Sequence, residues 1–346
     1  QPCPNCNKAK QREKYDTMVA ERQEFMAWIK TRHEKLQVEL SYLKTKHFII
    51  AWNIQRLPCD RKTKVKYGLP PNPPSLSLHE ALHIYAMRAE DYFDVHQEVF
   101  NLGEDDELDK VQVFWARNRR ERETIQTNHE YYENIYGVMA QYWTGTKGDS
   151  ATWAERRPDW GSDDNLKYTH AHLVALAIHD KWQRQCPPRP REVWLQHGYA
   201  HWMEYKFYRD SRIYCHHETQ PQVQSWGHYH WRFKIYKKVA AGEIVTFSDI
   251  INRSGDTWGY DEHGFVFAFV DFLIHYDKEK WLEFQKTIRQ TFKYAPTVEK
   301  VYGWSPMMFD EVFKDWVLAY YPRSKGEDNN WVYDPDNPRG KDGRKK

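Results

Sequence analysis

The pattern of hydrophobic positions begins with one long, mostly polar helix. Residues 8–44 are rich in Lys, Glu, Arg and Gln, and their hydrophobic residues recur at helical spacing from Met18 to Leu43. This pattern predicts a long amphipathic helix that lies on the body of the protein or on a partner. The apolar run at 46–53, KHFIIAWN, has the character of a strand. The sequence therefore predicts a docking helix followed by the start of a sheet.

Helical spacing returns in residues 77–100, where hydrophobic positions alternate at intervals of three and four. Ser77 and Glu80 form an S-x-x-E capping box, which marks the first turn of this helix. The run VQVFWAR at 111–117 predicts a second strand. The block 118–164 mixes aromatics, arginines and glycines, and we interpret it as a short helix followed by surface loops.

The C-terminal half is predicted to be helical. Residues 165–205 look like two helices, and three more are expected at 265–276, 280–292 and 306–320. Residues 322–346 are rich in Pro, Gly and charge, which is typical of a tail. The pattern as a whole indicates an α+β fold, mostly helical with a small β-sheet, and a division into 1–44, 45–321 and 322–346.

Composition excludes several classes of partner. The 51 basic and 49 acidic residues give a net charge of only +2 and are interspersed, so nucleic acid is not expected as a partner. No apolar run approaches the length of about 20 residues that spans a bilayer. Aromatic residues make up 16% of the chain, so the core is expected to be built from rings. The sequence begins at Gln1, as after removal of a signal peptide, so we expect an exported protein, periplasmic or extracellular.

The five cysteines suggest disulfides rather than a zinc ribbon. Cys3 and Cys6 form a CxxC, but no second CxxC follows it. The alternative to a metal-binding CxxC is that Cys3 or Cys6 forms a disulfide with Cys59 and that Cys186 forms one with Cys215. Disulfide connectivity does not follow from sequence. One thiol is left over in either arrangement.

A zinc-peptidase motif occurs at the start of the helix at 77–100. His79, Glu80 and His83 spell HEALH, the HExxH pattern in which two His one turn apart hold zinc and the Glu polarises its water. The capping box explains the same Glu80 as a helix cap, with the two histidines beside the hydrophobic stripe. Both interpretations, a zinc site and an ordinary packing helix, remain open.

The order of elements resembles the gluzincin-like, or peptidase-MA-like, family of secreted bacterial proteins across residues 44–320. The strands KHFIIAWN and VQVFWAR, the helix ending in AEDYFDVHQEVF and the segment VWLQHGYAHWMEY carry this resemblance. In that family a helix bearing HExxH is followed by WLxEGxAxY, whose Glu is the third zinc ligand. The most specific match lies in Trp194, Leu195, Gly198 and Ala200.

The resemblance implies that the peptidase site is degenerate. Tyr168 falls where the first zinc His stands, Thr169 where the catalytic Glu stands, and His172 on the second His, while His197 replaces the ligand Glu. It also gives the helix of HEALH no catalytic role. Thr169 cannot act as a general base near neutral pH, so ordinary zincin hydrolysis is not expected.

A different metal site is possible in the same stretch. His197 and His201 are four residues apart, so their rings lie one above the other on a helix, and His172 approaches them if the packing of the family is retained. His170 points to the other side of its helix. Three imidazoles suit Zn²⁺, Cu²⁺ or Ni²⁺. The alternative is that His172 and His197 hydrogen-bond each other or Tyr168.

Three functional hypotheses follow. The leading one is an exported protein with a zincin-like scaffold that has lost peptidase activity and acts in binding or assembly. Its N-terminal helix and C-terminal tail would dock on a protein partner or on another copy of the chain. The alternative is an enzyme, either a zinc metallopeptidase or another histidine-ligated metalloenzyme. A third class is a carbohydrate-binding surface, and exposure of Trp226 and Trp231 would decide for it. Separately, His228 and His230 would share one side of an extended segment.

Overall fold

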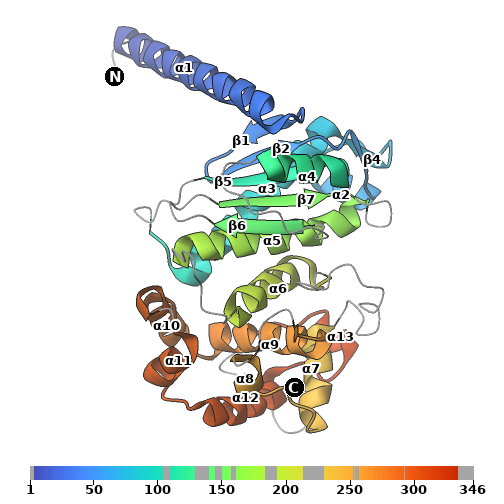
Figure 1. Cartoon of the computed structure of the whole chain (residues 1–346), viewed down its shortest axis with the longest axis vertical. Helices are drawn as coiled ribbons and strands as arrows, with labels where there is room; N and C mark the ends of the chain where they lie inside the picture. Colours follow the sequence, from blue (N-terminus) through green and yellow to red (C-terminus); the bar gives the residue numbers. More distant parts are fainter. Residues whose placement is uncertain are drawn as a thin grey trace.

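The computed structural model describes residues 4–103, 110–128, 140–144, 150–156, 161–183, 193–212, 230–251, 253, 257–291 and 293–333. Most of these residues are helical, and they stand beside a five-stranded mixed sheet and a two-stranded sheet. The prediction of a mostly helical α+β fold with a small β-sheet is confirmed. The N-terminal helix projects from one end, the sheet lies in the middle, and the later helices form the other end (Figure 1).

The five-stranded sheet has three parallel strands at its centre and an antiparallel strand at each edge. The central strands are β2 (Phe48–Trp52), β5 (Val111–Ala116) and β7 (Ser150–Glu155), and the edge strands are β1 (Ser41–Lys44) and β6 (Ala140–Thr144). The order is β1-β2-β5-β7-β6. Strands β2 and β5 are the two that the sequence predicted. The short helix expected after residue 118 is present at 119–128. The prediction of surface loops after it is wrong at β6 and β7, which are too short for their alternation to stand out.

The two faces of this sheet bury different side chains. Phe48, Ile50 and Trp52 of β2 enter the main core, in which α3 (Leu78–Phe100) also packs. Alternate residues, including Ala51 of β2, enter a smaller core with Ile125 of α4 (Arg119–Asn128). Alternation along a strand sends successive side chains to opposite faces, so α3 and α4 cover opposite faces of the sheet.

Helix α3 begins where the sequence predicted. The hydroxyl oxygen of Ser77 accepts from the Glu80 N–H, and the Glu80 carboxylate accepts from the Ser77 N–H at 2.7 Å. Between β2 and α3, the hairpin of β3 (Arg56–Pro58) and β4 (Ser75–Ser77) encloses α2 (Arg61–Lys66). Lys64 is buried and donates to the carbonyls of Pro73 and Ser75 at 3.0 Å each, which satisfies its charge and fixes the hairpin.

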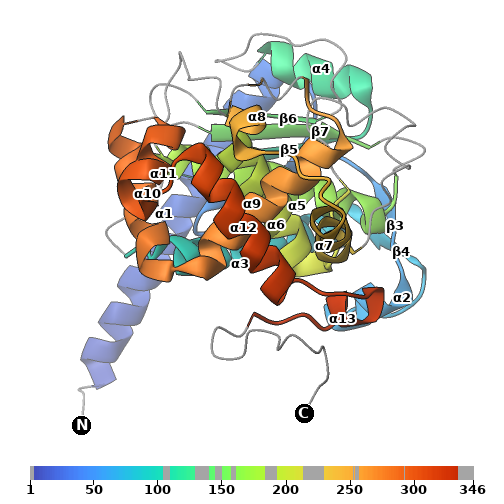
Figure 2. The ribbon, with the colours of Figure 1, turned by 90° about the horizontal axis from the view of Figure 1, so that it is seen from below.

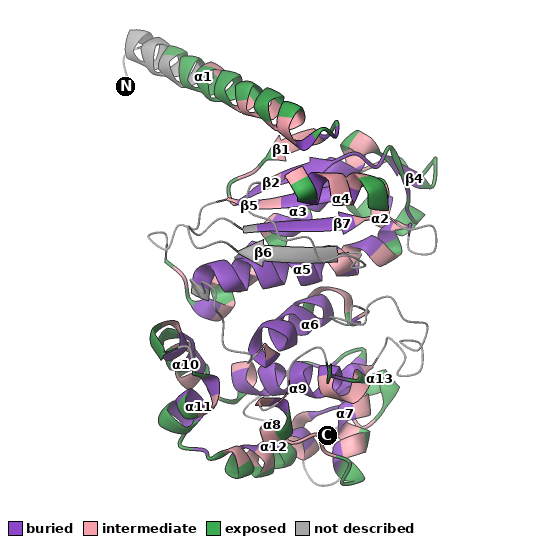
Figure 3. Ribbon diagram, viewed as in Figure 1, coloured by how far each residue is buried: buried purple, intermediate pink, exposed green. Residues whose placement is uncertain are grey.

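Three packed helices form the centre of the molecule. Helix α5 (Asp163–Gln183) packs on the strands β6 and β7, α6 (Trp194–Tyr208) packs on α5, and α9 (Tyr260–Tyr276) packs on α6. Figure 3 shows this part of the molecule as almost wholly buried. At the crossing of α6 and α9, a Cβ on Gly198 would lie 2.3 Å from the Val266 carbonyl oxygen. Only glycine allows the two backbones to approach this closely.

The remaining helices complete the C-terminal half. They are α7 (Trp231–Ala240), α8 (Phe247–Ile251), α10 (Lys278–Thr291), α11 (Tyr294–Tyr302), α12 (Pro306–Tyr320) and α13 (Lys325–Asp328). Helix α12 packs against α7, α8 and α9 (Figure 2). The core of this half is rich in aromatic rings, as the composition predicted. The helices expected at 265–276, 280–292 and 306–320 correspond to α9, α10 and α12.

Part of the predicted tail belongs to the body. The described residues 322–333 include α13, where Asp328 is buried and accepts from the Tyr205 hydroxyl at 2.8 Å. Trp331 is also buried, and its ring lies 3.9 Å from the Arg232 guanidinium carbon, which is itself paired with Asp271. The expectation of a tail from residue 322 is therefore wrong as far as 333, because Trp331 covers a buried charge. Residues 334–346 lie outside the described residues.

The N-terminal helix ends earlier than predicted. Helix α1 (Pro4–Leu36) stops where Gln37 takes a left-handed conformation, with φ 56°. Beyond it Leu36, Val38 and Leu40 are buried in alternation, which is the pattern of extended chain. At 33 residues, α1 is about 50 Å long, and most of it extends away from the body (Figure 1).

Cys59 does not form the predicted disulfide. Its thiol is free and buried, and burial raises its pKa to about 12. Cys6 lies in the first turn of α1, a helix most of which extends away from the body (Figure 1). Cys3, Cys186 and Cys215 lie outside the described residues.

Candidate metal centre

The buried contact between α5 and α6 contains a group of three potential metal ligands. His172 of α5 and His201 and Glu204 of α6 each offer a ligand atom, and these atoms lie within 4.8 Å of one another. All three side chains are fully buried, at 0% exposure. His201 and Glu204 share one face of α6 because they are three residues apart, and His172 meets them from α5. This group can hold a metal ion.

Glu204 is the centre of the polar contacts in this group. Its Oε1 lies 2.7 Å from His172 Nδ1 and 3.3 Å from His201 Nδ1, and its Oε2 accepts from the Arg212 N–H at 2.9 Å. His201 Nδ1 also lies 3.0 Å from the Ser211 hydroxyl oxygen, and its Nε2 lies 3.1 Å from Nδ1 of His263 on α9. The chain after α6 therefore folds back to complete the cluster.

The electrostatics of the cluster favour a cation. Burial lowers the pKa of His172 to about 3 and that of His201 to about 3, the latter opposed by the hydrogen bond to Glu204. Both imidazoles are therefore neutral near pH 7, and each can offer a lone pair to a metal. Glu204 is a buried carboxylate in contact with these two neutral rings. A divalent cation bound between the three ligands would place its positive charge beside this carboxylate.

Two of the distances between ligand atoms are close to those of a compact metal site. Ligand atoms about 2.0–2.1 Å from a tetrahedral zinc stand about 3.3 Å apart. The 3.3 Å between His201 Nδ1 and Glu204 Oε1 already has this value, whereas the 2.7 Å between His172 Nδ1 and Glu204 Oε1 is a hydrogen-bond distance. An ion would replace that hydrogen bond and move His172 slightly outward.

Of the three histidines predicted as ligands, the structure brings His172 and His201 together, with ring centroids 4.9 Å apart. His197 is buried nearby, and its ring centroid lies 6.3 Å from that of His172 and 5.9 Å from that of Trp258. Glu204 takes the third place in the group. Sequence reasoning missed it, although the i, i+3 spacing of His201 and Glu204 was a usable signal.

No carboxylate stands at the positions implied for the first zinc ligand and the catalytic Glu, which hold Tyr168 and Thr169. The Tyr168 ring packs against Tyr208 at 4.9 Å, with the Arg212 guanidinium 4.4 Å from its centroid. Thr169 is half-buried on α5. His170 faces the other side of the helix, as expected, where its Nε2 lies 2.8 Å from the Tyr85 carbonyl oxygen.

The HEALH histidines lie outside this cluster. His79 and His83 are exposed on the first turns of α3, with ring centroids 4.4 Å apart. Glu80 is used as the helix cap, and its hydrogen bonds with Ser77 lower its pKa. A carboxylate held in this way does not point to a water between the two histidines.

The aromatic region near residue 230 does not present the predicted sugar platform at Trp231. That residue opens α7 and is fully buried, and its ring lies 5.3 Å from that of His201. His230 precedes α7 in a left-handed conformation, with φ 65°. Trp226 and His228 lie outside the described residues.

Comparison with known proteins adds no relative. No family model matches the chain, and neither does any curated protein. The gluzincin resemblance therefore stays a prediction. Within the described part of the chain, no helix is both long enough and apolar enough to cross a membrane.

Proposed function

We propose that this protein has a zincin-like scaffold without peptidase activity and acts in binding or assembly, with a divalent metal bound by His172, His201 and Glu204. The observation that carries the proposal is the complete burial of the three ligands at the contact between α5 and α6. Structural metal sites are closed by protein ligands, whereas catalytic sites keep an open position for water or substrate. In this proposal the ion links α5 to α6 and does not activate a water for hydrolysis.

The residues around the cluster support a structural role. Hydrolysis by an HExxH site needs a carboxylate that takes a proton from the metal-bound water, and the implied positions are Tyr168 and Thr169. The one carboxylate in the group, Glu204, is already engaged by both histidines and by the Arg212 N–H. It is a ligand in this proposal and has no second role as a base.

The ligand set narrows the choice of ion. Two imidazole nitrogens and one carboxylate oxygen suit Zn²⁺, and also Cu²⁺ or Ni²⁺, whereas all-oxygen sites suit Mg²⁺ and Ca²⁺. His263, which contacts His201, is the nearest described side chain that could add a further nitrogen. Zn²⁺ is the ion proposed here, because it accepts a four-coordinate site without a redox reaction.

The assembly part of the proposal rests on α1. Met18 and Met26 are 58% and 57% exposed, on a helix most of which extends away from the body (Figure 1). An isolated helix gains little stability without a packing surface, so α1 is proposed to dock on a protein partner or a second copy. Residues 322–333 pack on their own body, so within the described residues the proposed docking element is α1, and residues 334–346 keep the docking role proposed for the tail. As in the secreted family that it resembles, the protein is proposed to work outside the cytoplasm.

Metal analysis of protein purified without a histidine tag tests the metal site. We expect one equivalent of metal in the natural chain and its loss in Glu204→Gln and in His172→Asn. The matched control is His79→Ala with His83→Ala, which removes an exposed histidine pair and should leave the metal in place. Zinc at about 100 times its dissociation constant should also raise the free energy of unfolding by about 2.7 kcal/mol.

Two results would contradict the proposal. The buried site is disproved if the natural chain holds no metal after zinc loading. It is also disproved if the metal is lost only in the variant that lacks His79 and His83. Peptide release that a chelator abolishes and that Glu204→Gln also abolishes makes the protein a peptidase.

A further inference from the structure

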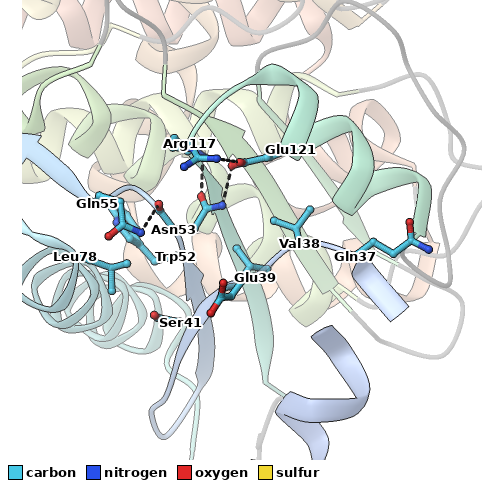
Figure 4. Close-up of a pocket in the computed structure, with 11 residues that line it drawn as sticks. Gln37, Val38, Glu39, Ser41, Trp52, Asn53, Gln55, Leu78, Arg117 and Glu121 are labelled. Carbon is cyan, nitrogen blue, oxygen red and sulfur yellow. Dashed lines mark hydrogen bonds and ion pairs between the residues drawn. The ribbon is translucent and has the colours of Figure 1, made fainter. Parts of the chain in front are cut away.

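A cavity of about 390 Å³ lies at the carboxyl ends of β2 and β5, away from the metal cluster. Asn53 and Gln55 follow β2, Arg117 follows β5, and Glu121 lies on α4 (Figure 4). The linker from α1 to β1, residues 37–41, forms another wall. Its volume is within the range of about 300–1,000 Å³ that is common for small-molecule pockets.

The topology of the sheet makes this a favoured place for a ligand. Strands β2 and β5 are parallel neighbours, and the chain leaves β2 toward α3 on one face and β5 toward α4 on the other. The two connections diverge and leave a crevice between the strand ends. In open α/β sheets, ligands bind in such a crevice, outside the carboxyl ends of the strands.

A polar network organises the cavity. Asn53 is only 7% exposed, and its side-chain Oδ1 accepts from the Arg117 N–H at 2.7 Å while its Nδ2 donates to Glu121 Oε2 at 2.7 Å. The Arg117 guanidinium also pairs with Glu121. An amide nitrogen carries two hydrogens, and one bond of Asn53 Nδ2 is accounted for by Glu121. No other acceptor for this nitrogen is found among the described residues, so its second hydrogen can be donated to a ligand at the base of the crevice.

The rest of the lining offers both hydrogen-bond donors and acceptors. Gln55 has an exposed side-chain amide, Ser41 a hydroxyl and Glu39 an exposed carboxylate, while Trp52 and Leu78 contribute apolar surface. The lining carries charges of both signs. The Glu39 carboxylate would repel a bound anion, and the Arg117 guanidinium would repel a bound cation. Hydroxyl groups both donate and accept, and a neutral ligand carrying several of them matches this lining.

We propose that this cavity binds a small neutral polyhydroxy molecule of monosaccharide to disaccharide size. Its hydroxyls are bound by Asn53, Gln55 and Ser41, and its C–H face lies against Leu78. Because residues 37–41 form one wall, a bound ligand also holds the linker that carries α1. This site is independent of the metal cluster, and binding is expected with or without a chelator.

Ligand-observed NMR and calorimetry with glucose, N-acetylglucosamine and maltose test the proposal on the full chain. We expect saturation transfer to at least one of these sugars at millimolar concentration. Gln55→Ala and Ser41→Ala should each weaken its binding by tenfold or more, and Leu78→Trp, which fills the cavity, should abolish it. Hydrogen exchange of the amides in residues 37–41 should slow when the sugar is added.

The control is Glu123→Gln, which changes a carboxylate of α4 that pairs with Arg119 and does not line the cavity. It should bind the sugar as the natural chain does. Absence of saturation transfer to all three sugars overturns the proposal, and so does binding that Gln55→Ala and Leu78→Trp leave unchanged. Equal binding of free lysine or glutamate overturns the assignment to a neutral polyol.

Discussion

Acidification from pH 8 to pH 5 should destabilise the fold through its buried histidines. Burial lowers the pKa values of His170, His172 and His201 to about 3, against an ordinary value of 6.5. Between these two values the unfolded chain binds more protons than the folded chain, so the free energy of unfolding falls as the pH falls. Below 6.5, each pH unit costs about 1.4 kcal/mol per histidine, which gives about 2 kcal/mol each at pH 5.

His170 is the clearest of the three because it lies outside the metal cluster. Trp115 Nε1 donates to its Nδ1 at 3.4 Å, and its Nε2 faces the Tyr85 carbonyl oxygen at 2.8 Å. A second proton would have to sit on Nδ1, where it would face the indole N–H. His170 alone therefore contributes about 2 kcal/mol at pH 5, which is a large share of a total stability of about 5–15 kcal/mol.

Urea unfolding followed by tryptophan fluorescence, with a chelator present and at pH 8, 6 and 5, measures this effect. His170→Gln removes one titrating group, so its loss of stability between pH 8 and pH 5 should be smaller by about 2 kcal/mol. The reasoning is refuted if the natural chain is equally stable at pH 8 and pH 5. It is also refuted if the variant loses as much stability as the natural chain.

Two further substitutions test the packing. Gly198→Ala places a Cβ against the backbone of α9 and should lower the free energy of unfolding by about 1–3 kcal/mol or more in urea unfolding. The control is Gly326→Ala, whose Cβ would meet nothing closer than 3.9 Å and which should be nearly neutral. Asp163→Ala leaves the buried guanidinium of Arg88 without its carboxylate and should cost about 3–5 kcal/mol. Asp16→Ala, which breaks the exposed pair with Arg12, should cost less than about 1 kcal/mol in the same measurement.

Local signals predicted much of the fold. Helix α3 could be placed because its capping box and its hydrophobic stripe both depend on neighbours three or four residues away. The ends of α1 and β1 could not, because the change from helix to extended chain depends on Gln37 in a left-handed conformation and on burial of Leu36 and Val38 under the sheet. Such burial is set by residues distant in the sequence, which periodicity does not show.

The candidate metal site could be predicted only in part, because it too depends on packing between residues distant in the sequence. Spacing along α6 showed that His197 and His201 are neighbours, but it did not show which of them lies closer to His172 of α5. The structure turns His201 and Glu204 toward His172 and leaves His197 beside Trp258. The rotation of α6 is fixed by its packing on α9 at Gly198, which no local pattern reveals.

The contacts of residues 325–331 bear on how the protein is synthesised. Asp328 binds Tyr205 and Trp331 covers the buried Arg232, so these late residues complete a core that begins more than a hundred positions earlier. Synthesis adds about 5–20 residues per second from the N-terminus. Arg232 therefore lacks the cover of Trp331 for at least about 5–20 s after it is made, and the core of the helical half cannot be completed before then.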